Sequence, residues 1–76
     1  MTDFSPSECA RRVAALPPYL RDVLRLMAEG QATKQIAAEL DLTESTVYVY
    51  RERTYSKLGV NNLACATRVA VTAGLV

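Results

Sequence analysis

Apolar residues recur every three or four positions along most of the chain, which is the spacing of one face of an α-helix. Leu20, Val23 and Met27 are a clear example. Prolines, glycines and small polar residues separate the periodic stretches and divide the chain into five segments. We therefore predict an all-α fold with five helices, at about 6–16, 18–29, 34–40, 44–58 and 62–74.

Residues that favour helix ends stand where these segments begin and stop. Ser5, Thr33 and Thr43 precede the first, third and fourth segments, where a side-chain oxygen can accept from a free backbone N–H group. Gly30 and Gly59 follow the second and fourth segments, where a left-handed residue ends many helices. These signals fix the predicted boundaries.

The third and fourth predicted helices are separated only by Asp41, Leu42 and Thr43. A short helix, a turn of about three residues and a longer helix are typical of a helix-turn-helix motif. In that motif the first turn of the second helix enters the major groove of DNA, and its free N–H groups can meet a phosphate. The spacing alone does not establish DNA binding, because packed helices without DNA also show it.

Charge is unevenly distributed along the chain. The 76 residues have room for one domain, and their net charge of +1 would not by itself suggest a nucleic-acid binder. Residues 45–76 hold four basic residues and one acidic residue, a net charge of +3. Residues 1–44 hold five basic and seven acidic residues, a net charge of −2. The positive C-terminal part is compatible with a face that meets phosphate.

The sequence offers no chemistry for catalysis. It has no histidine, no glycine-rich phosphate loop and no cluster of metal ligands, so we predict neither an enzyme nor a bound metal or cofactor. Cys9 and Cys65 are not spaced as a metal or redox pair and are interpreted as free thiols. We see no signal peptide and no stretch long enough to span a membrane, and we expect a cytoplasmic protein without a membrane partner.

From residue 16 to residue 76 the chain resembles the LuxR-type (GerE-like) DNA-binding domain, the output domain of the NarL/FixJ group. The resemblance implies a four-helix helix-turn-helix domain at 16–76, preceded by an extra N-terminal helical extension at 1–15. It also implies a bacterial transcriptional regulator that binds duplex DNA as a homodimer, with a recognition helix at about 44–58. The residues that carry it are Val23-Leu24, Ala28-Glu29-Gly30, Lys34-Gln35-Ile36-Ala37, Leu40-Asp41-Leu42-Thr43, Ser45-Thr46-Val47 and Lys57-Leu58-Gly59-Val60.

The candidate site residues come from this resemblance together with a helical wheel. On the wheel, Val47, Thr54 and Leu58 face the core, which leaves the opposite side of the recognition helix for DNA. The predicted DNA contacts are Thr33, Lys34, Thr43, Ser45, Thr46, Tyr48, Val49, Arg51, Glu52, Arg53 and Lys57. The resemblance implies dimerisation through the C-terminal helix, and an apolar stripe there supplies the predicted contacts Cys65, Val69, Thr72 and Val76.

Several positions depart from the family pattern. Tyr48 stands where a basic residue is usual, and Glu52 where a basic or polar residue is common. Tyr19-Leu20 replaces an Arg-Glu pair, and Leu63 replaces an arginine.

A second hypothesis therefore stays open beside DNA binding. The chain would then be a helix-turn-helix module that modulates another regulator and binds DNA weakly or not at all. Its protein partner would contact the recognition-helix face, with Tyr48, Val49, Glu52 and Tyr55.

Overall fold

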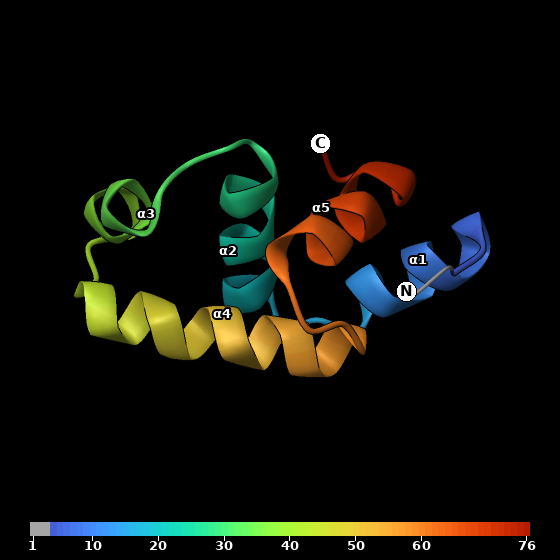
Figure 1. Cartoon of the computed structure of the whole chain (residues 1–76), viewed down its shortest axis with the longest axis horizontal. Coiled ribbons are helices and arrows are strands. Elements are labelled where there is room, and N and C mark those ends of the chain that lie inside the picture. Colours follow the sequence, from blue (N-terminus) through green and yellow to red (C-terminus); the bar gives the residue numbers. More distant parts are fainter. Residues whose placement is uncertain (1–3) are drawn as a thin grey trace.

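The computed structural model describes residues 4–76, and this part of the chain contains five α-helices and no strand (Figure 1). The predicted all-α fold is confirmed, and the helix ends agree with the predicted ones to within a turn. The helices are α1 (Pro6–Ala14), α2 (Pro18–Ala28), α3 (Thr33–Leu40), α4 (Glu44–Leu58) and α5 (Leu63–Thr72).

Side-chain oxygens cap three of the helix starts. Ser5 Oγ accepts from the Glu8 N–H at 3.2 Å, and Thr43 Oγ1 accepts from the Thr46 N–H at 3.2 Å. At the start of α5, Asn62 Oδ1 accepts from the Cys65 N–H at 2.9 Å. Each bond satisfies a backbone donor that has no partner inside its helix.

The third helix starts differently from the prediction. Its N-cap is Ala32, and Thr33 is the first helical residue, so the prediction that Thr33 caps α3 was wrong. The Ala32 N–H donates to Gln35 Oε1 at 2.8 Å, which moves the start one residue earlier. The Thr33 hydroxyl is occupied elsewhere, because it accepts from Arg51.

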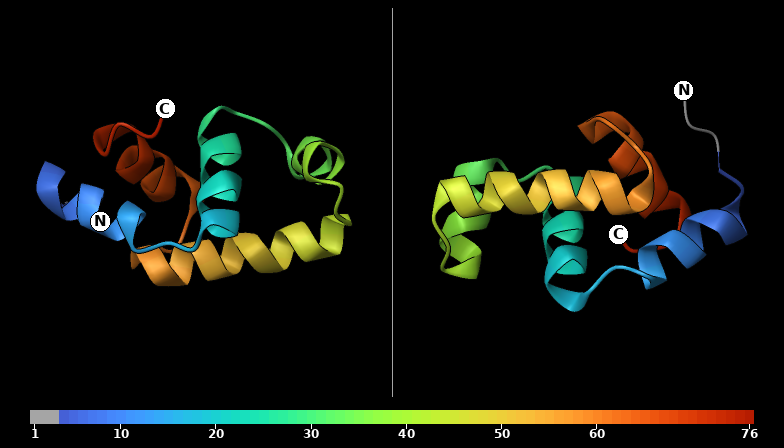
Figure 2. Two further views of the ribbon diagram at one scale, coloured as in Figure 1. Left: turned by 180° about the vertical axis from the view of Figure 1, so that it is seen from behind. Right: turned by 90° about the horizontal axis from the view of Figure 1, so that it is seen from below.

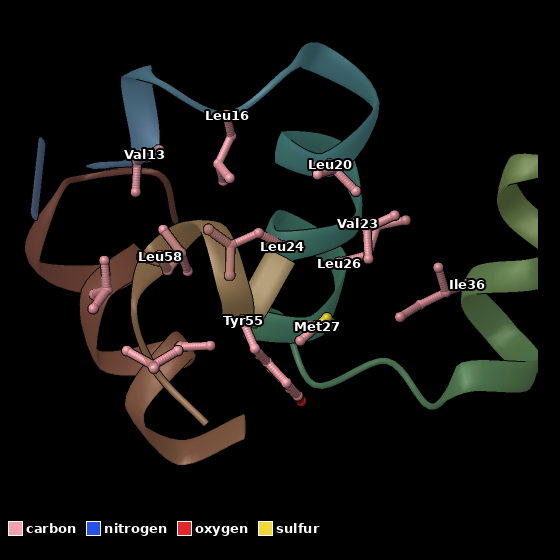
Figure 3. Packing of buried hydrophobic residues seen from close by; sticks show 14 of the residues in the cluster. Val13, Leu16, Leu20, Val23, Leu24, Leu26, Met27, Ile36, Tyr55 and Leu58 are labelled. Carbon is pink, nitrogen blue, oxygen red and sulfur yellow. The ribbon is translucent and has the colours of Figure 1, made fainter. Parts of the chain in front are cut away.

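One hydrophobic core joins all five helices (Figure 3). The core side chains of α2 lie at its centre, and Leu20, Val23 and Leu24 are fully buried. The α4 helix runs along one side of the molecule, with α2, α3 and α5 all on its other side (Figure 1). Seen from that free side, α4 lies in front of the other helices (Figure 2, right). The arrangement buries one face of α4 and leaves the opposite face open.

The N-terminal helix is packed onto the rest of the fold. It contacts α5 and α4, and its Cys9 and Val13 belong to the common core. Arg12 Nη1 donates to the carbonyl oxygen of Leu58, the last residue of α4, at 3.0 Å. A cation there satisfies a free carbonyl and opposes the negative end of the helix dipole. The α1 helix therefore fixes the C-terminal end of α4.

Replacing Gly59 tests this attachment. Gly59 has φ 76°, and a Cβ at this position would meet Arg12 Nη1 at 2.7 Å. Gly30, with φ 93° and nothing within 4 Å, is the matched control for backbone strain alone. We expect Gly30→Ala to cost about 1–2 kcal/mol of unfolding free energy. Gly59→Ala should cost about 1 kcal/mol more, because the Arg12 bond is also displaced.

Urea denaturation of both variants measures the difference. Equal losses at the two glycines would show that the contact between Arg12 and the end of α4 contributes nothing to stability.

Candidate nucleic-acid interface

The fourth helix presents the face that the wheel predicted. Val47, Thr54 and Leu58 are buried against the core. Tyr48 is 55% exposed and Val49 is 49% exposed. The remaining residues of this outward face are also exposed, namely Ser45, Glu52 and Ser56. No other helix lies in front of α4 on this side of the molecule (Figure 2, right).

The turn before α4 sets the angle between α3 and α4. Asp41 adopts the left-handed conformation at φ 58°, and the Leu42 N–H donates to the Ala37 carbonyl at 2.8 Å. Leu42 itself packs against the core. Thr43 then caps α4, and its hydroxyl also bonds to Thr46 Oγ1 at 2.9 Å. Ser45 Oγ lies 3.2 Å from Thr43 Oγ1 and belongs to the same network, and Ser45 is exposed on the outward face.

Arg51 lies on one flank of the outward face. Its Nη1 donates to Thr33 Oγ1 at 2.7 Å, and its Nη2 donates to Tyr55 Oη at 3.2 Å. The guanidinium also lies 5.8 Å from the centre of the Tyr48 ring. These contacts hold the cation at the N-terminal end of α3, next to the exposed Lys34. Two basic residues therefore meet on this flank.

Arg53 lies on the other flank. Its Nη1 donates to Tyr19 Oη at 3.4 Å, and its guanidinium lies 5.7 Å from the centre of the Tyr50 ring. Tyr19 and Tyr50 pack edge to face, with ring centres 4.9 Å apart. Lys57 follows Arg53 one helical turn later and is exposed. The outward face thus has cations along both edges and the Glu52 carboxylate at its centre.

Two residues assigned to this face have other roles. Tyr55 is 8% exposed and packs in the core, so its assignment to the recognition face was wrong. Thr33 is 9% exposed, and its hydroxyl accepts from Arg51. Thr33 therefore positions Arg51, and its assignment as a direct DNA contact is corrected. Both corrections have one cause, since α3 and α2 close over this side of α4.

The stripe assigned to the dimer contact is only partly on the surface. Thr72 and Val76 are exposed, whereas Cys65 is half-buried and Val69 is 4% exposed. Val69 lies in the core because both α1 and α2 pack against α5. The assignment of Val69 to a contact between subunits was therefore wrong. Val71, which is 55% exposed, lies on a different side of α5, because residues two positions apart on a helix are separated by about 200°.

The sequence pattern did not reveal the aromatic pair beside Arg53. Tyr19 was noted only as a departure from a family pattern, and Tyr50 was not among the candidate site residues. In the structure the two rings, with Arg53, form one cluster between α2 and α4. A signal existed, because Tyr19 and Arg53 are both placed near the outward sides of their helices, but a wheel does not show which helices lie side by side.

We searched the described residues for membrane-spanning helices, metal sites and disulfides. Across residues 4–76, no helix is long and apolar enough to cross a membrane. In the same range no group of three or more histidine, cysteine, aspartate or glutamate side chains is placed to hold a metal ion. Cys9 and Cys65 are both free cysteines.

The fold and the site together define a class, the LuxR-type helix-turn-helix DNA-binding domain, which is not an enzyme class. The family model described as "Bacterial regulatory proteins, luxR family" matches residues 20–70, which is more than half of the chain. This chain belongs to that family, as an output domain of the NarL/FixJ kind.

Known relatives agree with this assignment. The transcriptional regulatory protein FixJ of Bradyrhizobium diazoefficiens is 37% identical over 68 residues, covering 90% of this chain and 33% of FixJ. UhpA of Salmonella typhimurium, also a transcriptional regulatory protein, is 42% identical over 60 residues, covering 79% of this chain and 31% of UhpA. A crystal structure of full-length FixJ from B. japonicum superimposes with a TM-score of 0.82 at 35% identity, over 93% of this chain and 35% of that one. The chain thus spans about a third of the length of these relatives.

Proposed function

We propose that this chain binds duplex DNA as a homodimer and regulates transcription in the cytoplasm, with α4 as the recognition helix. The observation that carries the proposal is the uncovered outward face of α4, bordered on both sides by arginines that other helices hold in place. In this proposal residues 16–76 are the DNA-binding domain, and residues 1–15 are a helical extension of it.

The geometry of α4 suits a major groove. The groove is about 12 Å wide and admits one α-helix. With the outward face toward the bases, Val49 and Glu52 point to base edges, while Arg51 and Arg53 point to opposite walls of the groove. Contacts from the flanks to phosphate fix the register, and contacts from the central residues select the sequence.

A second subunit would cover the exposed apolar residues of α5 and of the chain end that follows it. Val71 and Val76 are 55% and 46% exposed, on a small domain whose other large aliphatic residues are mostly buried. A two-fold axis through this side of α5 would place the same residues opposite each other. It would also hold two copies of α4 about 34 Å apart, which is one turn of DNA.

A protein partner on the outward face is the alternative function. The observation that favours it is the exposure of Tyr48 and Val49 beside the Glu52 carboxylate, since exposed aromatic and apolar side chains are common at protein interfaces. A carboxylate at the centre of the face also weakens attraction to a polyanion.

Salt dependence of DNA binding distinguishes the two functions. With three or four phosphate contacts per subunit, a dimer should show a slope of log K against log salt of about −5 to −7. The measurement is a titration of the 76-residue chain into random-sequence duplex at several salt concentrations. Undetectable binding at low salt would favour the protein-interaction function.

Reversing the charge of Glu52 should strengthen DNA binding. Glu52→Lys replaces repulsion of phosphate by attraction, and we expect tighter non-specific binding and a salt slope steeper by about 0.9 per bound subunit. Glu29→Lys is the control, because it makes the same charge change at the far end of α2 from α4 (Figure 1). Our account of the face is wrong if Glu52→Lys weakens binding to all sequences, or gains no more than the control.

Substitutions at two valines of α5 distinguish the dimer contact from the core. Val71→Arg should leave a folded monomer, because the side chain is on the surface and faces its own copy across the dimer. Val69→Arg should unfold much of the protein, since a buried unpaired charge costs on the order of 3–5 kcal/mol. Circular dichroism reports folding, and light scattering reports mass. A wild-type monomer at high concentration, or a Val71→Arg dimer, would exclude this side of α5 as the interface.

A further inference from the structure

The first turn of α2 reaches the side of α4 and places Tyr19 beside the outward face. The Tyr19 ring packs edge to face on Tyr50 at 4.9 Å, yet the residue stays 41% exposed. Its phenol hydroxyl meets Arg53 Nη1 at 3.4 Å. Tyr19 belongs to none of the helices of the helix-turn-helix, so this contact adds a residue from a different part of the chain to the edge of the recognition helix.

Tyr19 and Arg53 keep unused hydrogen-bond donors after the bond between them has formed. Arg53 donates to the phenol oxygen of Tyr19, so the phenol O–H remains free to donate to another group. The guanidinium has five N–H donors, and this bond uses one of them. A bond that the phenol accepts from a cation also polarises its O–H and strengthens it as a donor. The pair therefore presents two kinds of donor and a positive charge from adjacent positions.

The aromatic rings hold these donors in place. The Arg53 guanidinium lies 5.7 Å from the centre of the Tyr50 ring, within the range of a cation–π interaction. An arginine that is already braced loses less rotamer entropy when it binds an anion. The same arrangement repeats on the opposite flank, where Thr33 and Tyr55 brace Arg51.

We infer that Tyr19 and Arg53 form a phosphate site, which takes one phosphate of the DNA backbone at the groove wall opposite Arg51. The inference rests on the proposed function and adds Tyr19, a residue outside the helix-turn-helix, to the DNA contacts. The ligand chemistry is a singly charged phosphodiester, which accepts from a guanidinium and from a hydroxyl at the same time.

The surroundings select a phosphate on a duplex over a free anion. Tyr19 lines a cleft of about 230 Å³ between α2, α3 and α4. Asp22 lines this cleft together with Tyr50 and the apolar Leu40 and Leu42, so the carboxylate repels an anion from the interior. A phosphate therefore meets Tyr19 and Arg53 at the rim only, where a rigid duplex seated on α4 would present one.

The test is a titration of the 76-residue chain into random duplex at several salt concentrations, with matched variants. Tyr19→Phe keeps the ring that packs on Tyr50 and removes only the hydroxyl. Arg53→Gln removes the charge, and Arg11→Gln removes an equal charge from the outer side of α1, where the side chain is 72% exposed. Circular dichroism and thermal melting show that each variant keeps the fold.

We expect Tyr19→Phe and Arg53→Gln each to weaken binding about tenfold, as for a bond to a charged group. Arg53→Gln should also lower the salt slope by about 0.9 per bound subunit. Arg11→Gln should bind within about twofold of the wild type, since Arg11 lies on α1, outside the recognition face, and is already paired with Glu8. The double variant should lose less than the product of the two single losses, because both groups hold one phosphate.

Two results separate the failure of this inference from the failure of the proposed function. If the wild type binds duplex but Tyr19→Phe binds equally well, or Arg53→Gln loses no more than Arg11→Gln, the phosphate site is refuted and DNA binding through α4 stands. If the wild type binds no duplex, the proposed function fails and the phosphate site fails with it.

Discussion

Burial of the apolar face of α2 is the constraint on which the rest of this structure depends. Leu20, Val23 and Leu24 have no exposed surface, and α2 contacts α3, α4 and α5. Each such side chain contributes about 1.5–3 kcal/mol when it leaves water. In a domain of 76 residues, where total stability is small, the other helices can satisfy this face only by surrounding it. Since α2 meets α4 from one side, the opposite side of α4 stays open to a partner.

The same packing decides where the charges of the site lie. Because α3 crosses the beginning of α4, Thr33 stands where it can hold Arg51, and because α2 begins beside the middle of α4, Tyr19 stands where it can hold Arg53. Both arginines are thereby drawn to the edges, and the centre of the face is left to Val49 and Glu52. A chain of net charge +1 offers a polyanion little overall attraction, so the placement of its basic residues matters more than their number. The affinity of one subunit should be modest for this reason, which is consistent with a dimer as the functional unit.

The sequence predicted most of what depends on neighbouring residues, with the cap of α3 as an exception. Helix ends follow from capping side chains and glycines, and the core face of α4 follows from the spacing of Val47, Thr54 and Leu58. The sequence did not predict how the helices pack against one another. The burial of Val69 depends on the packing of α1 against α5, which no local sequence pattern predicts. Tyr55 was misplaced for a similar reason, since its ring enters the core while its hydroxyl remains near the surface beside Arg51.

Amide chemical shifts recorded during a titration with duplex DNA test the central claim most directly, because they report every position at once. If α4 is the recognition helix, the largest changes should fall on its outward face at Ser45, Val49 and Glu52, with smaller changes at Lys34 and Tyr19 on the two flanks. The outer side of α1, around Arg11, should change little. No change at saturating DNA, or changes confined to helices other than α4, would contradict the account.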